Sequence, residues 1–175
     1  MSDSPSQGMF ARISKERATR DVYLSRRMAI RQADERALPG IARLLDDNHL
    51  PLDGVADHLS TMVIAEDEGR IVACAGLELY ADGALLRSVA VAASHRGRGL
   101  GLELTRAALG LAQRHGSPAV YLLTTTAEGF FPKFGFERIP RADVPTGVQQ
   151  SVEFVSACPA SAVVMRKTLV APIAR

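Results

Sequence analysis

Hydrophobic and polar residues follow a regular pattern from Met28 onward. Apolar side chains recur at helical spacing in two long and two short stretches. Gly116 and Pro118 follow the longest of them and would end a helix there. The pattern predicts helices over Asp34–Asn48, Leu52–Leu59, Gly99–His115 and Ala127–Phe134.

Shorter apolar or alternating runs between these stretches predict strands. They lie at Met28–Ala33, Thr61–Glu66, Ile71–Leu79, Ala84–Val91, Ala119–Thr125, Phe136–Ile139 and Ala162–Thr168. The apolar run Ala119–Thr125 is typical of a central strand buried on both faces. A crossover from Ala84–Val91 through the Gly99–His115 helix should make these two strands parallel. The predicted class is therefore α/β (α+β), with one mixed sheet flanked by helices.

Length and composition fit one ordinary globular domain. The chain has 175 residues, of which 47% are hydrophobic and 23% charged. No apolar run reaches the roughly 18 residues of a membrane span, and the first residues lack the apolar core of a secretory signal. We therefore expect a cytoplasmic protein without a membrane partner. The net charge of +2, the 5% of aromatic residues and the absence of Trp argue against a nucleic-acid partner.

Residues 1–27 differ from the rest of the chain. Seven Lys or Arg residues lie between Arg12 and Arg31, against Glu16 and Asp21. One interpretation is a basic arm for an acidic partner, nucleic acid included. The other, which we favour, is a flexible extension upstream of a domain that comprises residues 28–175.

The segment Arg96-Gly97-Arg98-Gly99-Leu100-Gly101 stands between a predicted strand and a predicted helix. Glycines allow the backbone to approach a ligand closely. The next helix offers its unpaired first N–H groups and the positive end of its dipole. Arg96 and Arg98 add charge suited to phosphate. These features predict a pyrophosphate site, against the alternative of a glycine-rich connection without a ligand.

Two other phosphate motifs do not fit this loop. The dinucleotide fingerprint requires an acidic residue roughly 20 positions further on, and the strand found there has no Asp or Glu. The P-loop requires Lys and then Ser or Thr after its last glycine, where this chain has Leu102 and Glu103.

The motif Arg96-x-x-Gly99-x-Gly101, preceded by Ser88–Val91, resembles the coenzyme A motif of the GNAT acetyltransferase superfamily. The order of elements is similar from Met28 to the C-terminus. The resemblance implies the GNAT fold, with about six to seven strands, and acetyl-CoA as co-substrate. It also implies a bulged strand whose backbone pairs with pantetheine. The implied cofactor-binding residues are Val89, Ala90, Val91, Arg96, Gly97, Arg98, Gly99, Leu100, Gly101 and Leu102.

Two further stretches narrow the resemblance. Leu122–Phe136, followed by Arg141–Pro145, is similar to the acetyltransferase domain of N-acetylglutamate synthases. Ser151–Met165 resembles the GNAT acetyltransferases associated with arsenic resistance. The resemblance implies an amino-acid-like substrate, including an arsenic-containing amino acid. The synthases bind carboxylates with basic residues where this chain has Cys158–Ser161, which argues against glutamate itself.

Acetyl transfer needs a neutral amine and donors for the oxygen that becomes negative. We expect the backbone N–H of Val89 to be one donor, exposed by a bulge. Glu78 is a candidate base acting through a water, although a solvated edge residue is the favoured interpretation. Phe131 stands where many GNAT enzymes carry a tyrosine acid, so no tyrosine acid is expected. Tyr121 is expected in the core.

Arg87 lies among apolar neighbours, and a buried guanidinium needs an anionic partner. It either clamps an anionic group of the substrate or pairs with an internal carboxylate such as Glu78. Further candidate substrate ligands are Thr124, Lys133 and Ser161. Thr126 is expected to cap the next helix, and Cys158 to be a packing residue. His49, His58, His95 and His115 lack metal-ligand spacing, so we expect surface histidines and no metal.

These observations predict an acetyl-CoA-dependent N-acetyltransferase acting on a small, anionic, amino-acid-like amine, in one version an arsenic-containing amino acid in a resistance role. The alternatives are an ordinary amino-acid acetyltransferase and a non-catalytic acetyl-CoA-binding sensor or interaction module. Since GNAT domains often pair through sheet edges or C-terminal strands, a homodimer is among the expected assemblies.

Overall fold

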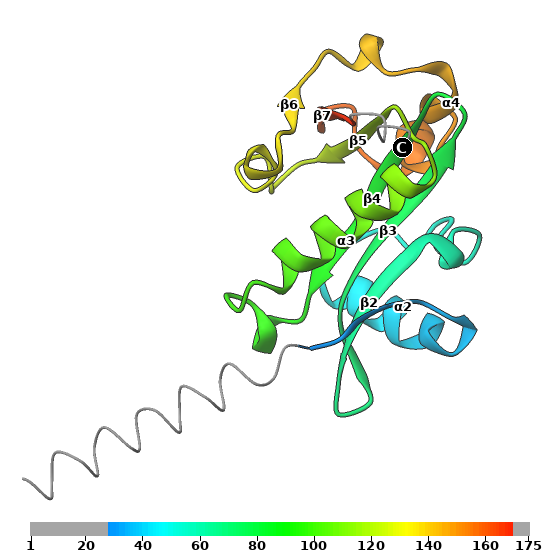
Figure 1. Ribbon diagram of the computed structural model, residues 1–175. Coiled ribbons are helices and arrows are strands. Elements are labelled where there is room, and N and C mark those ends of the chain that lie inside the picture. Colours follow the sequence, from blue (N-terminus) through cyan, green and yellow to red (C-terminus); the bar gives the residue numbers. More distant parts are fainter. Residues whose placement is uncertain (1–27, 170–175) are drawn as a thin grey trace, which may run out of the picture.

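The computed structural model describes residues 28–169, which form one seven-stranded sheet with helices on both faces (Figure 1). The sheet order is β1-β2-β3-β4-β5-β7-β6. Only β4 and β5 are parallel neighbours, and the other pairs are antiparallel. The strands are β1 (Ile30–Gln32), β2 (Met62–Asp67), β3 (Arg70–Tyr80), β4 (Gly83–Val91), β5 (Ala119–Thr124), β6 (Glu137–Arg138) and β7 (Val163–Thr168).

The helices differ greatly in length. Two are long, α2 (Leu38–Asp47) and α3 (Leu100–Arg114), and α4 (Thr146–Gln149) is a single turn. A π-helical turn, η6 (Glu153–Ala157), follows α4. Short 3₁₀ turns complete the set: η1 (Glu35–Ala37), η2 (Leu59–Thr61), η3 (Ala93–His95), η4 (Phe131–Phe134) and η5 (Arg141–Asp143).

The predicted sheet is confirmed in strand number and in the parallel crossover through α3. Two short helices were predicted wrongly. Leu52–Leu59 forms turns because Gly54 has a φ of +73°, outside the helical region. Ala127–Phe134 is helical only in η4. Sequence analysis missed α4 and η6, and the prediction for residues 1–27 lies outside the described residues.

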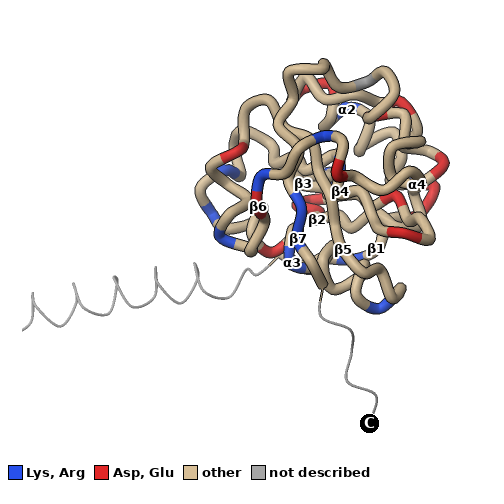
Figure 2. The backbone as a smooth tube through the Cα atoms, turned by 90° about the horizontal axis from the view of Figure 1, so that it is seen from above, with Lys and Arg blue, Asp and Glu red and all other residues tan. Residues whose placement is uncertain are grey.

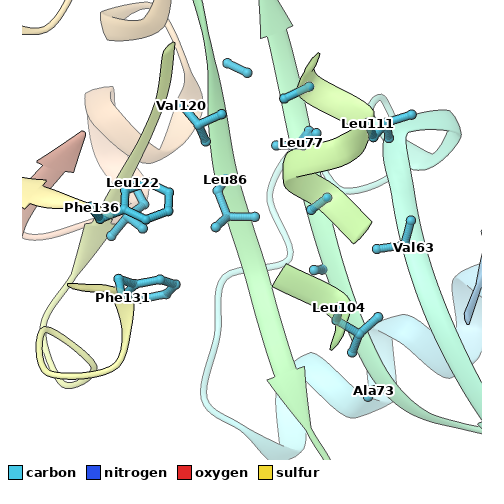
Figure 3. Close-up of a cluster of buried hydrophobic side chains, with 14 of the residues drawn as sticks. Val63, Ala73, Leu77, Leu86, Leu104, Leu111, Val120, Leu122, Phe131 and Phe136 are labelled. Atoms are coloured by element: carbon cyan, nitrogen blue, oxygen red, sulfur yellow. The ribbon is translucent and has the colours of Figure 1, made fainter. Parts of the chain in front are cut away.

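Each face of the sheet carries its own core. On one face, α3 packs its apolar side over β2, β3 and β4, and Figure 3 shows Leu77, Leu86 and Leu104 among the side chains of this cluster. On the other face, one cluster surrounds Ile41 of α2 and a second surrounds Val148 of α4. The polar pair Glu78 and Arg87 belongs to none of these three clusters, although both residues are buried.

Strand β4 departs from regular pairing on both of its sides. Against β3 the register shifts, so that Ser88 and Val89 stand opposite the single residue Ala75. Ser88 there has a φ of +54°, as expected of a bulged position. Against β5 the ladder contains only the pairs Ala84–Val120 and Leu85–Tyr121, so the two strands separate beyond Leu85. Both irregularities fall at the same place in the sheet.

Candidate active site

A cavity of about 720 Å³ lies where β4 and β5 separate, between the start of α3 and η4. Nine of the ten residues predicted to bind the cofactor line it. Arg98 is exposed and is not among the lining residues. The lining nine are Val89, Ala90, Val91, Arg96, Gly97, Gly99, Leu100, Gly101 and Leu102. The structure thus brings the strand and the loop together around one space.

The glycine loop turns into α3 through left-handed backbone. Gly97 and Gly99 have φ values of +76° and +84°, which favour glycine. The carbonyl of Gly99 accepts the N–H groups of Leu102 and Glu103 at 3.0 and 3.1 Å. The N–H groups of Leu100 and Gly101 come before Leu102, the first residue whose N–H has an acceptor at the start of this helix, and both residues line the cavity. A helix start of this kind favours an anionic group.

Two cations border the cavity. The Arg96 guanidinium donates to the Asn48 side-chain oxygen at 2.7 Å and to the Val91 carbonyl at 3.1 Å, which ties the end of α2 to the end of β4. Lys133 is exposed, and its Nζ lies 4.5 Å from the centre of the Phe130 ring. Among the described residues that line the cavity there is no Asp or Glu. The positive charge around the cavity therefore suits a phosphorylated ligand.

The bulge in β4 is held from the strand beside it. The Cys74 thiol donates to the Ser88 carbonyl at 3.2 Å. Burial raises the pKa of Cys74 to about 12, so this thiol stays protonated and keeps donating. Val89, directly after Ser88, lines the cavity. The part of Val89 N–H in stabilising an oxyanion stays a prediction.

Arg87 is buried, with 4% of its surface exposed, and has acceptors at all three nitrogens. Nη1 donates to Glu78, and Nη2 donates to the Asp53 carbonyl at 2.6 Å. Nε lies 3.3 Å both from the Ser88 hydroxyl and from Oε1 of Glu153. The interpretation that Arg87 pairs with an internal carboxylate is therefore realised. Its role as a substrate ligand stays a prediction.

Glu78 is 1% exposed, so its interpretation as a solvated edge residue was wrong. It lies on β3, an interior strand, and faces Arg87. The Tyr80 hydroxyl donates to it, and Nε2 of His58 is 3.6 Å away. Through these contacts with Arg87, Tyr80 and His58, Glu78 belongs to a buried polar network.

Sequence analysis missed Glu153, the second carboxylate on Arg87. It lies on η6, where a carboxylate between Val152 and Phe154 is the same signal that drew attention to Arg87. Burial raises the pKa of Glu153 to about 7, Arg87 opposes this, and Glu78 adds to it. A carboxyl group that titrates near neutral pH inside a polar network is typical of functional sites.

The other substrate candidates are not gathered at one place. Thr126, not Thr124, was predicted to cap the next turn, yet the Thr124 hydroxyl accepts the N–H of Ala127 at 2.9 Å. Ser161 is exposed and lines a separate cavity of about 530 Å³ beside Arg138 and Arg141. Of Thr124, Lys133 and Ser161, Lys133 alone is among the residues that line the β4–β5 cavity, and Thr126 lines it as well. Substrate binding by Thr124, Lys133 and Ser161 stays a prediction.

Phe131 and Tyr121 are both buried, and the core position expected of Tyr121 is confirmed. Phe131 is buried, lines the cavity and packs edge-on against Phe136, their ring centres 5.7 Å apart (Figure 3). A phenyl ring at this position carries no hydroxyl to act as an acid. Tyr121 is 6% exposed and packs in the cluster around α4.

Histidine and cysteine positions correct two smaller expectations. His49 and His115 are exposed as expected, but His58 and His95 are partly buried and face carboxylates, His95 at 3.1 Å from Asp67. Cys158 is only partly buried, with its sulfur 3.9 Å from Glu153. Within residues 28–169, no group of three or more His, Cys, Asp or Glu is arranged to hold a metal ion.

Charge is mixed over the described chain, and Figure 2 shows basic and acidic positions interspersed along the tube. Within residues 28–169, no helix combines the length and hydrophobicity needed to cross a membrane.

Comparisons with known proteins agree with this geometry. Residues 58–138 match the family model described as an acetyltransferase (GNAT) domain. The N-acetylglutamate synthase of Neisseria gonorrhoeae, solved with coenzyme A and N-acetyl-glutamate, is similar in fold, with a TM-score of 0.70 and 22% identity. The similarity covers 82% of this chain and 35% of that one. The chain therefore has the GNAT fold, and residues 58–138 are similar to the GNAT acetyltransferase domain.

Three further relatives show the extent of the similarity. Rv2747 of Mycobacterium tuberculosis, solved with coenzyme A, has a TM-score of 0.69 and 23% identity over 81% of this chain and 99% of that one. An uncharacterised N-acetyltransferase of Chlorobaculum tepidum is 26% identical over 54% of this chain and 61% of its own length. The citrate lyase ligase of Escherichia coli is 28% identical over 63% of this chain and 30% of its own. The chain thus spans less than two thirds of the curated relatives it matches.

Proposed function

We propose that this protein is an acetyl-CoA-dependent N-acetyltransferase that acts on the amine of a small amino-acid-like molecule. The observation that carries the proposal is the β4–β5 cavity, where the loop Arg96–Gly101, the first N–H groups of α3 and the open edge of β4 line one space. A phosphate group would lie against the loop, and an extended chain would reach along β4 toward the bulge. Coenzyme A bound in related structures supports this use of the cavity.

The chemistry follows from the positions of these groups. When an amine is held against a bound thioester, the reaction no longer needs a bimolecular encounter. This can lower the activation free energy by about 7–11 kcal/mol. The N–H of Val89, at the interruption of the β3–β4 ladder, would stabilise the developing oxyanion. With Phe131 in place of a tyrosine, the coenzyme A thiolate would leave without a tyrosine acid and take its proton from the attacking amine or from water.

The substrate class rests on two supports. One is the N-acetyl-glutamate bound by a synthase of the same fold. The other is the resemblance of Ser151–Met165 to acetyltransferases associated with arsenic resistance, which brings arsenic-containing glutamate analogues into the class. A second copy of this chain is a proposed partner. A non-catalytic acetyl-CoA-binding module is the competing function, and Phe131 is the observation in its favour.

Thiol release from acetyl-CoA tests the proposal, with glutamate, other amino acids and phosphorus- and arsenic-containing glutamate analogues as acceptors. Release with one compound is the expected result. If acetyl-CoA binds but no thiol is released with any of these acceptors, the protein is a non-catalytic binding module and not an enzyme for this class of substrate.

The loop is tested in the same assay. Replacing Arg96 with Ala should raise the dissociation constant of acetyl-CoA about tenfold, since a charge-assisted bond contributes roughly 1.5–3 kcal/mol at best and Arg96 is exposed. Arg106→Ala, on the exposed side of α3 and outside the cavity, is the matched control and should change nothing. Equal effects of the two variants would place the phosphate site elsewhere.

A further inference from the structure

Two carboxylates share one guanidinium at the centre of the molecule. Arg87 lies between Glu78 of β3 and Glu153 of η6, and side-chain exposure is 2% for Arg87, 1% for Glu78 and 7% for Glu153. With both carboxylates ionised, the trio keeps one uncompensated negative charge. Buried charge of this kind is costly, so it needs a further cation or a bound proton.

The two carboxylates are not equivalent. The Glu78 carboxylate accepts hydrogen bonds from Nη1 of Arg87 and from the Tyr80 hydroxyl, and the His58 ring lies beside it. Glu153 has Nε of Arg87 at 3.3 Å and the Cys158 thiol at 3.9 Å. Because Glu78 is held by stronger contacts, the uncompensated charge falls mainly on Glu153.

Glu153 lies close to the proposed site of acetyl transfer. Its Oε1 is 3.3 Å from Nε of Arg87, and that nitrogen is 3.3 Å from the hydroxyl of Ser88, the bulged residue. Val89, the next residue, lines the cavity. One side chain therefore separates Glu153 from the strand position where the thioester would be held.

The network is buried beneath two surface segments that carry exposed apolar side chains. Val152 and Val155, on either side of Glu153, are 40% and 73% exposed, and Leu52 on the opposite segment is 46% exposed. A Cβ at Gly54 would lie 3.2 Å from Nη1 of Arg87 and 3.9 Å from Val152. The two segments thus meet directly over the network, with apolar side chains at the rim that suit the carbon skeleton of a small amine.

We propose that Glu153 is a catalytic residue that accepts the proton of the acceptor ammonium, and that Arg87 and Glu78 are positioning residues that hold it. This inference rests on the proposed function and adds that the acceptor site prefers a positively charged group. The network attracts an ammonium group, and a carboxylate of the same substrate would have to bind outside it, because all three nitrogens of Arg87 already have acceptors.

The proposed step is balanced. An N–H bond of the ammonium breaks and its proton joins Glu153, which leaves a neutral amine. The nitrogen lone pair attacks the thioester carbonyl carbon, the C–N bond forms, and the C–S bond breaks. The departing thiolate takes the second amine proton, and Glu153 returns its own proton to solvent. The products are the acetylated amine, coenzyme A and one proton.

The charged and titratable groups around Glu153 set its pH range. They are Arg87 on β4, Glu78 and Tyr80 on β3, His58 before η2, Arg141 on η5 and Cys158 after η6. Since the pKa of Glu153 is raised to about 7, the proton-accepting form prevails above this pH. The rate should therefore rise through neutral pH.

The test compares Glu153→Gln, Glu153→Asp and the full-length wild type, with the panel compound that releases most thiol as the acceptor. Glu153→Gln should lower kcat/KM about 100-fold, the usual size of general-base catalysis, and lose the rise near pH 7. Glu153→Asp should keep that rise at a reduced rate. Acetyl-CoA binding should change less than twofold in both, and Glu137→Gln, an exposed carboxylate on β6, should match the wild type.

The outcomes separate the two proposals. A wild type that releases no thiol with any compound overturns the proposed function and this inference with it. An active wild type whose pH profile and rate are shared by Glu153→Gln overturns the role of Glu153 alone. Loss of acetyl-CoA binding in both Glu153 variants would show a structural role and also overturn it.

Discussion

At the scale of single residues, the polar groups of the buried network determine one another's state. Arg87 faces two carboxylates, and the pKa of Glu153 is raised because burial outweighs the contact that Arg87 gives it. Removing the arginine would leave buried carboxylates unpaired, which typically costs 3–5 kcal/mol. Removing Glu153 leaves the ion pair with Glu78 intact, so this change should be tolerated.

Glu153 makes stability depend on pH in a defined direction. Its pKa is about 7 in the folded chain against an ordinary 4.5, so the folded state binds its proton more tightly. The contribution of Glu153 to the free energy of unfolding is fully present below pH 4.5, where the carboxyl group is protonated, and it is lost as the pH rises to 7. The loss amounts to about 3 kcal/mol at 1.36 kcal/mol per pKa unit.

Glu153→Gln should therefore gain about 3 kcal/mol relative to the wild type between pH 4.5 and pH 8. Urea unfolding at several pH values measures the difference. The exposed Glu137→Gln should show no such trend. A difference between Glu153→Gln and the wild type that is independent of pH would mean that Glu153 has an ordinary pKa.

At the scale of elements, the connection between α2 and β2 shows how one glycine alters a predicted structure. Residues 52–59 have helical spacing of apolar side chains, but Gly54 takes a φ of +73° and turns the chain over Arg87. The turn places the Asp53 carbonyl on Nη2 of Arg87. A helix here would have directed that carbonyl along its own axis.

Gly54→Ala should destabilise the chain by about 1 kcal/mol or more, because alanine is strained at this φ and its Cβ would lie 3.2 Å from Arg87. Gly129→Ala is the matched control. Its φ is not left-handed and its Cβ would meet no atom within 4 Å, so the change should stay within about 0.5 kcal/mol. Urea unfolding compares the two, and equal effects would show that Gly54 does not determine the turn.

The spacing of apolar residues was sufficient to predict the long helices and strands, because a long element repeats the same pattern of buried and exposed positions many times. It was not sufficient for α4, a single turn, or for η6, whose π-helical turn has no sequence period of its own. Nine of the cavity residues could be predicted because they lie together in the chain, from Val89 to Leu102, whereas Asn48 and the residues between Thr126 and Lys133 reach the cavity from other parts of the chain. Glu153 could not, since it meets Arg87 only through folding, 66 residues away in sequence.

At the scale of the whole molecule, residues 28–169 form hydrophobic clusters on both faces of the sheet. Met28 and Ile30 pack against the cluster under α3, and β1 pairs with β2 at the edge of the sheet. The structural elements on which the proposed function depends all lie within residues 28–169.

A chain that starts at Met28 should therefore fold with the same free energy of unfolding, within about 0.5 kcal/mol. It should also release thiol from acetyl-CoA at the full-length rate. Urea unfolding and the thiol assay check both expectations. A drop in either would give residues 1–27 a part in the domain, and salt-sensitive binding of nucleic acid that disappears on truncation would identify them as a basic arm.

The short ladder between β4 and β5 has a consequence for how the molecule responds to its donor. Two residue pairs join the halves of a sheet whose β3–β4 ladder alone has seven. A ligand that bonds to the open edge of β4 and also contacts η4 would join the halves. Binding to the folded state alone adds RT ln(1 + [L]/Kd) of stability, about 2.7 kcal/mol at a hundredfold excess over Kd. Such a protein would resist unfolding and proteolysis in proportion to the acetyl-CoA around it, so its lifetime would report the supply of the donor.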